Sequence, residues 1–240
     1  MPITIAHPSA ILPLIRYHHI LSISAMVIGS MIPDFEHFFI MEPSEKVGHS
    51  LVGILIFDLP IGILVYYITK YLFKPILNKV SPIRFKIEFR GNKYPFWAVL
   101  VSLLIGIGSH FLLDAITGEE GYFVKDLPFL FKDIQLTKNI EMNVHLFIWL
   151  FISVFGFAHL IWLGLVYFDL SATVKSFKDL SSWPLFMLEL LTVVGVIVTV
   201  RNLLTERPYI LWDWGILIGG ALFYALVIVC LRWKFMRKEH

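Results

Sequence analysis

The sequence has little charge and a single cysteine. Charged residues make up 16% of its 240 residues, whereas 58% are hydrophobic and 15% are aromatic. Soluble domains carry about a quarter charged residues, so this composition is typical of a membrane protein. The one cysteine, Cys230, excludes an intrachain disulfide and a cysteine-ligated metal cluster. The formal net charge is only +2 and no basic patch is interleaved with aromatics, which predicts no nucleic-acid partner.

The N-terminus also lacks the marks of a secretory signal peptide, because residues 1–6 contain no lysine or arginine. Membrane insertion is therefore expected to use internal apolar segments. A helix needs about 20 apolar residues to cross the hydrocarbon core of a bilayer. Five runs meet this requirement, at residues 51–73, 94–117, 143–167, 184–200 and 209–233.

A sixth apolar stretch, residues 9–32, is ambiguous. Arg16, His18 and His19 interrupt it, and its uninterrupted part from residue 20 is too short to span. We interpret it as a re-entrant or interfacial helical hairpin with Pro13 near the break. One tilted spanning helix is the alternative.

The predicted fold class is all-α. We expect a polytopic membrane helical bundle of about five spans plus the N-terminal hairpin, in a single integral membrane domain over residues 1–240. Recognisable motifs are confined to residues 1–117, and residues 118–240 read as a less specific helical region. No oligomeric state is predicted.

The distribution of lysine and arginine predicts the orientation in the membrane. These residues are more numerous in the first loop, the third loop and the C-terminal tail than in the second and fourth loops. Cytoplasmic loops carry this excess. The C-terminus is therefore expected in the cytoplasm, and the region before residue 51 mostly on the outer side.

His110 and Asp114 are ionisable residues at the end of the second apolar run. Their spacing of four places both side chains on one helix face, one turn apart. An imidazole and a carboxylate in this arrangement can share a metal ion. The alternative is a hydrogen-bonded pair that joins two helices without a metal.

Two further stretches add polar residues expected on the same side of the membrane. Pro33 is followed by Asp34, Glu36 and His37, although an aspartate after proline is also a common start of a turn. His49 precedes Ser50, a residue that suits the N-cap of the following helix.

Asp58 lies within the first apolar span. A carboxylate inside a span is energetically costly and is usually functional or paired, and the nearby Pro60 is expected to open the helix and supply a partner.

Together these motifs resemble a bacterial membrane-protein family of unknown function. The residues that carry the resemblance are Met1-Pro-Ile-Thr-Ile-Ala-His7-Pro8, Gly29-Ser-Met-Ile-Pro33-Asp34, His49-Ser-Leu51, Phe57-Asp-Leu-Pro60 and Ser109-His110 with Asp114 and Thr117. That family is similar to inner-membrane proteins classed as metal-dependent hydrolases. The resemblance implies six metal-ligand positions: His7, Asp34, His37, His49, His110 and Asp114.

The chain also departs from the hydrolase pattern. Ser44 stands where a second histidine is common, Gly118 where a further histidine or polar residue is common, and Glu36 where an aspartate is usual. These departures argue against a full multinuclear ligand set and favour a single metal ion.

The resulting hypothesis is a membrane-embedded metal-dependent hydrolase of the bacterial cytoplasmic membrane, with a divalent metal, zinc by preference. Glu36 or Asp58 would accept the proton from water. A site at headgroup depth would meet membrane lipid, so a lipid-like or phosphoester substrate at the outer leaflet is expected. One alternative is a transporter with a proton or cation path through Asp58, His110 and Asp114. Another is a non-catalytic scaffold that keeps a structural metal.

The most demanding expectation is that His7 reaches the same site as His110. For the two to meet, residues 9–32 must turn back instead of crossing the membrane. Arg16 opposes this, because at membrane depth its charge would cost several kcal/mol unless it reaches the surface or pairs with an acid.

Overall fold

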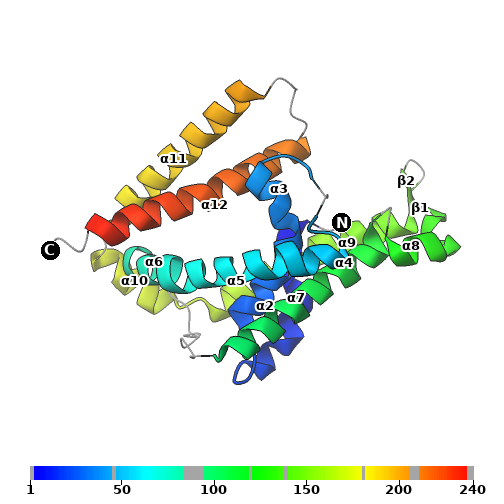
Figure 1. Ribbon diagram of the computed structural model, residues 1–240, viewed down its shortest axis with the longest axis horizontal. Helices are drawn as coiled ribbons and strands as arrows, with labels where there is room; N and C mark the ends of the chain where they lie inside the picture. Colours follow the sequence, from blue (N-terminus) through cyan, green and yellow to red (C-terminus); the bar gives the residue numbers. More distant parts are fainter. Residues whose placement is uncertain are drawn as a thin grey trace. The chain divides into compact units, whose positions relative to one another are not determined.

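The computed structural model describes residues 3–44, 47–83, 94–118, 121–137, 140–179, 182–205 and 211–236. Across these ranges the chain is helical apart from one short antiparallel strand pair (Figure 1). Five helices are long and apolar enough to cross a membrane: Leu51–Val80, Phe96–Asp126, Val144–Tyr167, Ser182–Leu204 and Trp212–Met236. The predicted all-α class with five spans is confirmed, and the chain is an integral membrane protein.

A sixth crossing is added if the helical stretches Ile23–Gly29 and Ile32–Ile40 form one broken span. Several of the cations used to predict the orientation lie outside the described residues: Arg84, Lys86, Arg90, Lys93, Arg237 and Lys238.

Contacts divide the chain into two compact units, each described by itself below. The first unit comprises Met1–Pro33, Gly48–Ile63 and Phe89–Val166. The second comprises Asp34–Val47, Leu64–Glu88 and Tyr167–His240. The prediction of one domain over residues 1–240 stays a prediction.

The first span contains two π-helical turns, each just before a proline. The span is built from α4 (Leu51–Gly53), η4 (Ile54–Asp58), α5 (Leu59–Ile68), η5 (Thr69–Phe73) and α6 (Lys74–Val80). The π turns η4 and η5 end two residues before Pro60 and Pro75. Proline has no N–H and its ring meets the carbonyl four residues earlier, so a wider turn relieves the clash. The hydroxyl of Ser50 accepts a 2.9 Å hydrogen bond from the Gly53 N–H, which confirms its capping role.

The N-terminal segment of the first unit is a helical hairpin. It runs through η1 (Thr4–Ala6), α1 (Pro8–Ile11) and η2 (Leu12–Tyr17), turns, and returns as α2 (Ile23–Gly29) and η3 (Ile32–Asp34). At the turn, the Tyr94 hydroxyl donates to the carbonyl of His18. Tyr94 directly precedes α7 (Phe96–Thr117), so the turn lies beside the beginning of α7.

The returning helix α2 packs closely against α7. The Ser22 N–H donates to the hydroxyl of Ser102 at 2.9 Å, near the beginning of both helices. Farther along, a β-carbon on Gly106 would lie only 2.2 Å from the Met26 carbonyl oxygen, and one on Gly29 only 2.3 Å from that of Leu103. The two backbones can approach this closely only because both positions are glycine.

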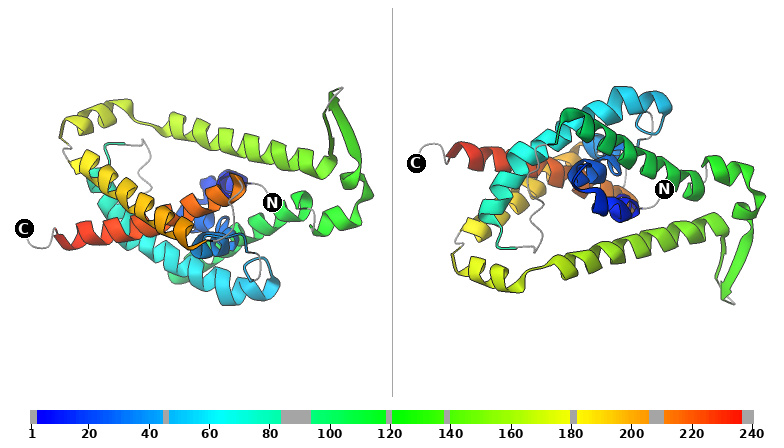
Figure 2. Two further views of the ribbon diagram at one scale, coloured as in Figure 1. Left: turned by 90° about the horizontal axis from the view of Figure 1, so that it is seen from above. Right: turned by 90° about the horizontal axis from the view of Figure 1, so that it is seen from below.

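A compact connection joins α7 to the next span. It contains α8 (Tyr122–Asp126), η6 (Pro128–Phe131) and the strand pair β1 (Asp133–Thr137) and β2 (Ile140–Asn143), after which α9 (Val144–Tyr167) begins (Figure 2). The N-terminal hairpin also contacts α9. The Ile3 N–H donates to the hydroxyl of Ser153, and a β-carbon on Gly156 would lie 2.9 Å from that of Ala6.

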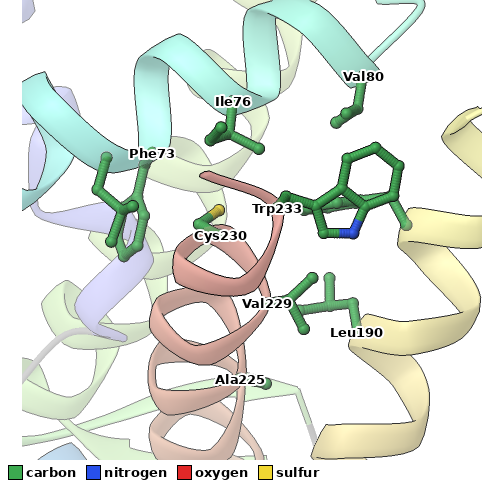
Figure 3. Close-up of a cluster of buried hydrophobic side chains, with 10 residues drawn as sticks. Phe73, Ile76, Val80, Leu190, Ala225, Val229, Cys230 and Trp233 are labelled. Carbon is green, nitrogen blue, oxygen red and sulfur yellow. The ribbon is translucent and has the colours of Figure 1, made fainter. Parts of the chain in front are cut away.

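The second unit has its own apolar core. It contains α3 (Phe35–Ile40), α10 (Leu170–Asp179), α11 (Ser182–Leu204) and α12 (Leu211–Met236), and α11 packs along α12. Its core is formed by buried side chains of η5, α6, α11 and α12, several of which are labelled in Figure 3: Phe73, Ile76, Val80, Leu190, Ala225, Val229, Cys230 and Trp233.

One carboxylate at the margin of this core has two partners. Glu189 accepts a 2.8 Å hydrogen bond from the indole N–H of Trp233 and forms an ion pair with Arg232. Pairing the charge and satisfying the indole lets an acidic residue sit on an otherwise apolar helix.

Candidate metal centre

His110 and Asp114 meet on one face of α7, as their spacing predicts. The His110 Nε2 atom lies 3.1 Å from Asp114 Oδ2. His110 is fully buried and Asp114 is 15% exposed. The pair therefore lies inside the first unit, with the carboxylate nearer to its surface.

The orientation of His110 is fixed from α2. Its Nδ1 atom is 2.9 Å from the carbonyl oxygen of Ser30. A carbonyl oxygen only accepts, so Nδ1 carries the proton and Nε2 of the neutral ring presents a lone pair toward Asp114. Metal-binding histidines are held in this way by a partner on the other ring nitrogen. Gly106 makes the contact possible, because it lies one turn before His110 and lets α2 approach.

His7 reaches the same place from the N-terminal hairpin. Its Nε2 atom is 3.6 Å from Asp114 Oδ1, and its ring stacks on that of His110 with centroids 4.1 Å apart. The prediction that His7 meets His110 is confirmed, and residues 9–32 do turn back. Arg16 is exposed close to the turn, over the ring of Tyr17, so its charge is not buried.

His7 is also oriented by a backbone carbonyl. Its Nδ1 atom lies 3.4 Å from the carbonyl oxygen of Ile3, a long contact that favours the proton on Nδ1. Its Nε2 atom is then the bare nitrogen, as in His110. The fully buried His7 therefore presents a lone pair toward Asp114.

His49 is the fourth residue of the group. Its Nε2 atom lies 3.2 Å from His110 Nε2 and 3.6 Å from Asp114 Oδ2. The preceding Gly48 packs on Pro33, where a β-carbon would lie 2.5 Å from the carbonyl oxygen. This close backbone contact holds the residue before His49 against the end of the N-terminal hairpin. We call His7, His49, His110 and Asp114 the polar cluster.

Four donor-atom distances within the polar cluster match those in the first shell of a tetrahedral metal ion. Bonds from zinc to histidine nitrogen or carboxylate oxygen are about 2.0–2.2 Å, which separates neighbouring ligand atoms of a tetrahedron by about 3.4 Å. The four distances given above lie between 3.1 and 3.6 Å.

Hydrogen bonding accounts for only part of this spacing, through the 3.2 Å contact between His49 Nε2 and His110 Nε2. Within the part of the chain that the structure describes, the buried Nε2 of His7 and both carboxylate oxygens of Asp114 have no hydrogen-bond partner. Leaving such atoms unsatisfied is costly. Lone pairs directed at one shared cation, not at each other, would remove this cost. The residues therefore fit a divalent metal ion.

The other three residues with predicted site roles near Pro33 belong to the second unit. Glu36 accepts hydrogen bonds from the hydroxyl of Ser44 at 2.6 Å and from the N–H of Val47 at 3.0 Å. The Ser44 N–H donates to His37 Nδ1 at 2.8 Å, so the proton of neutral His37 lies on Nε2. These bonds give Glu36 and His37 a role in holding the loop after α3. The ligand role of Asp34 stays a prediction.

Asp58 is completely buried in the first unit. It is the last residue of the π turn η4, where the helix widens before Pro60. π turns of this kind are frequent at functional sites. Its role as a proton acceptor stays a prediction.

Sequence reasoning missed the residues that orient the ligands. The Ser30 and Ile3 carbonyls are main-chain groups and leave no trace in the side-chain pattern. The small residues Gly29 and Gly106 were available as a signal, because small residues mark close helix contacts in membranes.

Comparison with known proteins gives a family without an assigned activity. A family model described as "Domain of unknown function (DUF4184)" matches residues 1–231. No curated protein matches the chain, and no solved structure matches it.

Proposed function

We propose that this chain, which belongs to the DUF4184 family, binds one divalent metal ion, zinc by preference, and hydrolyses a lipid-like ester or phosphoester. The observation that supports this most is the donor spacing of the polar cluster, with three imidazole nitrogens and one carboxylate whose two oxygens have no hydrogen-bond partner in the described part of the chain. Imidazole and carboxylate together suit zinc among the common divalent metals.

A bound zinc ion would lower the pKa of a water molecule to about 7 and polarise an ester or phosphoryl oxygen. The residues of the chain would orient the ligands and balance the charge of the metal. The Ser30 and Ile3 carbonyls hold two imidazoles with Nε2 bare, and Asp114 offsets part of the metal charge. Of the two predicted proton acceptors, we favour Asp58, because it is buried in the same unit as the polar cluster, whereas Glu36 belongs to the second unit and holds the loop after α3.

The second candidate is a structural metal. Structural zinc sites are closed by four protein ligands, whereas catalytic sites keep one position for water. The polar cluster offers four protein donors, and a metal there would fasten the N-terminal hairpin to α7. In this case the chain would be a scaffold whose folding depends on the metal.

Activity assays separate the two candidates. Zinc-loaded protein in lipid nanodiscs is expected to hydrolyse at least one of p-nitrophenyl phosphate, bis-p-nitrophenyl phosphate, p-nitrophenylphosphorylcholine and a fluorogenic phospholipid. Chelation should abolish the rate and zinc should restore it. Asp58→Asn is expected to keep the metal and lose about 10²-fold or more in rate, as removal of a general base does. Full zinc content without turnover on any of these compounds would favour the structural metal.

The proposed location is the bacterial cytoplasmic membrane, with the C-terminus in the cytoplasm. Lys79 near the end of α6 and Gln135 in β1 are exposed, and the charge bias places them on opposite sides of the membrane. A membrane-impermeant thiol reagent applied to intact cells should label Gln135→Cys and spare Lys79→Cys until the cells are opened. The wild-type chain is the blank, because its Cys230 is buried. The reverse pattern would place the polar cluster near the cytoplasmic surface.

A further inference from the structure

The connection between α7 and α9 carries a group of exposed aromatic and aliphatic side chains. Two buried residues, Val124 and Leu130, hold residues 122–131 against the first unit, with 0% and 3% of their surfaces exposed. The other large side chains point outward, with exposed fractions of 70% for Tyr122, 38% for Phe123, 41% for Leu127, 57% for Phe129 and 42% for Phe131. The segment is therefore amphipathic, and the buried side chains of Val124 and Leu130 fix it in place.

Its position follows from the two spans that it joins. α7 ends at Thr117 and α9 begins at Val144, so the connection joins the end of one apolar helix to the beginning of the next, and we expect it at the membrane surface on that side. The turn into α8 is tight. A β-carbon on Gly121 would lie 2.6 Å from the carbonyl oxygen of Asp114. The exposed aromatics thus begin directly after a residue that contacts the main chain of Asp114.

We propose that residues 122–131 form a membrane-surface anchor whose partner is the headgroup and ester region of the lipid bilayer. Aromatic side chains are enriched at this depth, where one end of the ring is in an apolar environment and the other is hydrated. Continuity with two membrane-spanning helices favours lipid over a soluble partner. This proposal does not depend on whether the polar cluster binds a metal or catalyses a reaction.

The net charge of the anchor indicates whether it prefers neutral or anionic lipids. Within residues 122–131 Lys125 is balanced by Asp126, so the anchor itself carries no net charge. Basic interfacial helices bind anionic lipids electrostatically, and that contribution is absent here. The anchor is then held in the membrane by its apolar surface alone. We expect its depth in the bilayer to be the same in neutral and anionic bilayers and to be independent of salt.

Spin labels test the anchor in the complete protein. Phe129→Cys and Tyr122→Cys are labelled with a nitroxide and reconstituted in phosphatidylcholine liposomes, with and without phosphatidylglycerol. Gln135→Cys in β1 is the matched control, because it is exposed in the same connection but beyond the aromatic segment. We expect a several-fold higher ratio of oxygen to nickel-chelate accessibility at residues 122 and 129 than at residue 135, with no change on adding anionic lipid or salt.

Two results would overturn the proposal. High nickel accessibility at residues 122 and 129, equal to that at residue 135, would place the segment in water. Low accessibility to both oxygen and nickel would mean that protein, such as a second copy of the chain, covers it. Zinc content of the same samples reports separately on the polar cluster, so failure of the anchor and failure of the metal site are distinguishable.

Discussion

His110→Ala is expected to lower the zinc content of the purified protein from about one ion per chain to a small fraction of that value. The imidazole of His110 lies 3.2 Å from His49 Nε2 and 3.1 Å from Asp114 Oδ2, and its ring stacks on that of His7. Its loss also leaves the Ser30 carbonyl without its donor. Elemental analysis of protein purified without chelators measures the effect, and Asp114→Ala is expected to give the same result.

His159→Ala is the matched control. His159 is an exposed histidine on α9, in the same unit but outside the polar cluster. Its replacement should leave the zinc content unchanged. Equal zinc content in all variants would show that the ion binds elsewhere. Wild-type protein that contains no transition metal would contradict the hypothesis.

Gly106→Ala is expected to cause the largest loss of stability of any single methyl group added to α7. The new β-carbon would lie 2.2 Å from the Met26 carbonyl oxygen and 2.6 Å from the Ser30 nitrogen, and both atoms are backbone. Because a backbone cannot rotate away, α2 must move, at a cost of about 1–3 kcal/mol or more. Displacing Ser30 also removes the bond that orients His110, so zinc content should fall together with the midpoint of thermal unfolding.

Gly108→Ala separates this clash from the general effect of replacing glycine. Gly108 is on the same helix, and a β-carbon there meets nothing within 4 Å. Alanine is favoured over glycine in helices by about 1 kcal/mol, so this variant should unfold at the wild-type temperature or slightly above it. Equal destabilisation of both variants, followed by tryptophan fluorescence in detergent, would argue against close packing of α2 on α7.

Patterns within one element were predictable from the sequence. The five spans follow from apolar runs, and the contact between His110 and Asp114 follows from a spacing of four on a helix. The capping by Ser50 is a local interaction of the same kind. His7 was placed correctly for a different reason, since its position followed from the resemblance and not from any periodicity.

Contacts between elements were not predictable in this way. The pairing of Ser30 with His110 depends on how closely α2 approaches α7, which the short-range pattern does not encode. The loop-anchoring bonds of Glu36 and His37 depend on the path of the chain at Ser44 and Val47. The aromatic segment around Phe129 was passed over, because an amphipathic segment this short gives only a weak periodic signal.

X-ray absorption at the zinc edge tests the central claim most directly. The polar cluster predicts a first shell of four nitrogen or oxygen atoms at about 2.0–2.1 Å, with the outer-shell scattering of three imidazole rings. His49→Ala should reduce that scattering to two rings while zinc remains detectable at high metal concentration. A spectrum with no imidazole scattering, or with sulfur in the first shell, would contradict the account.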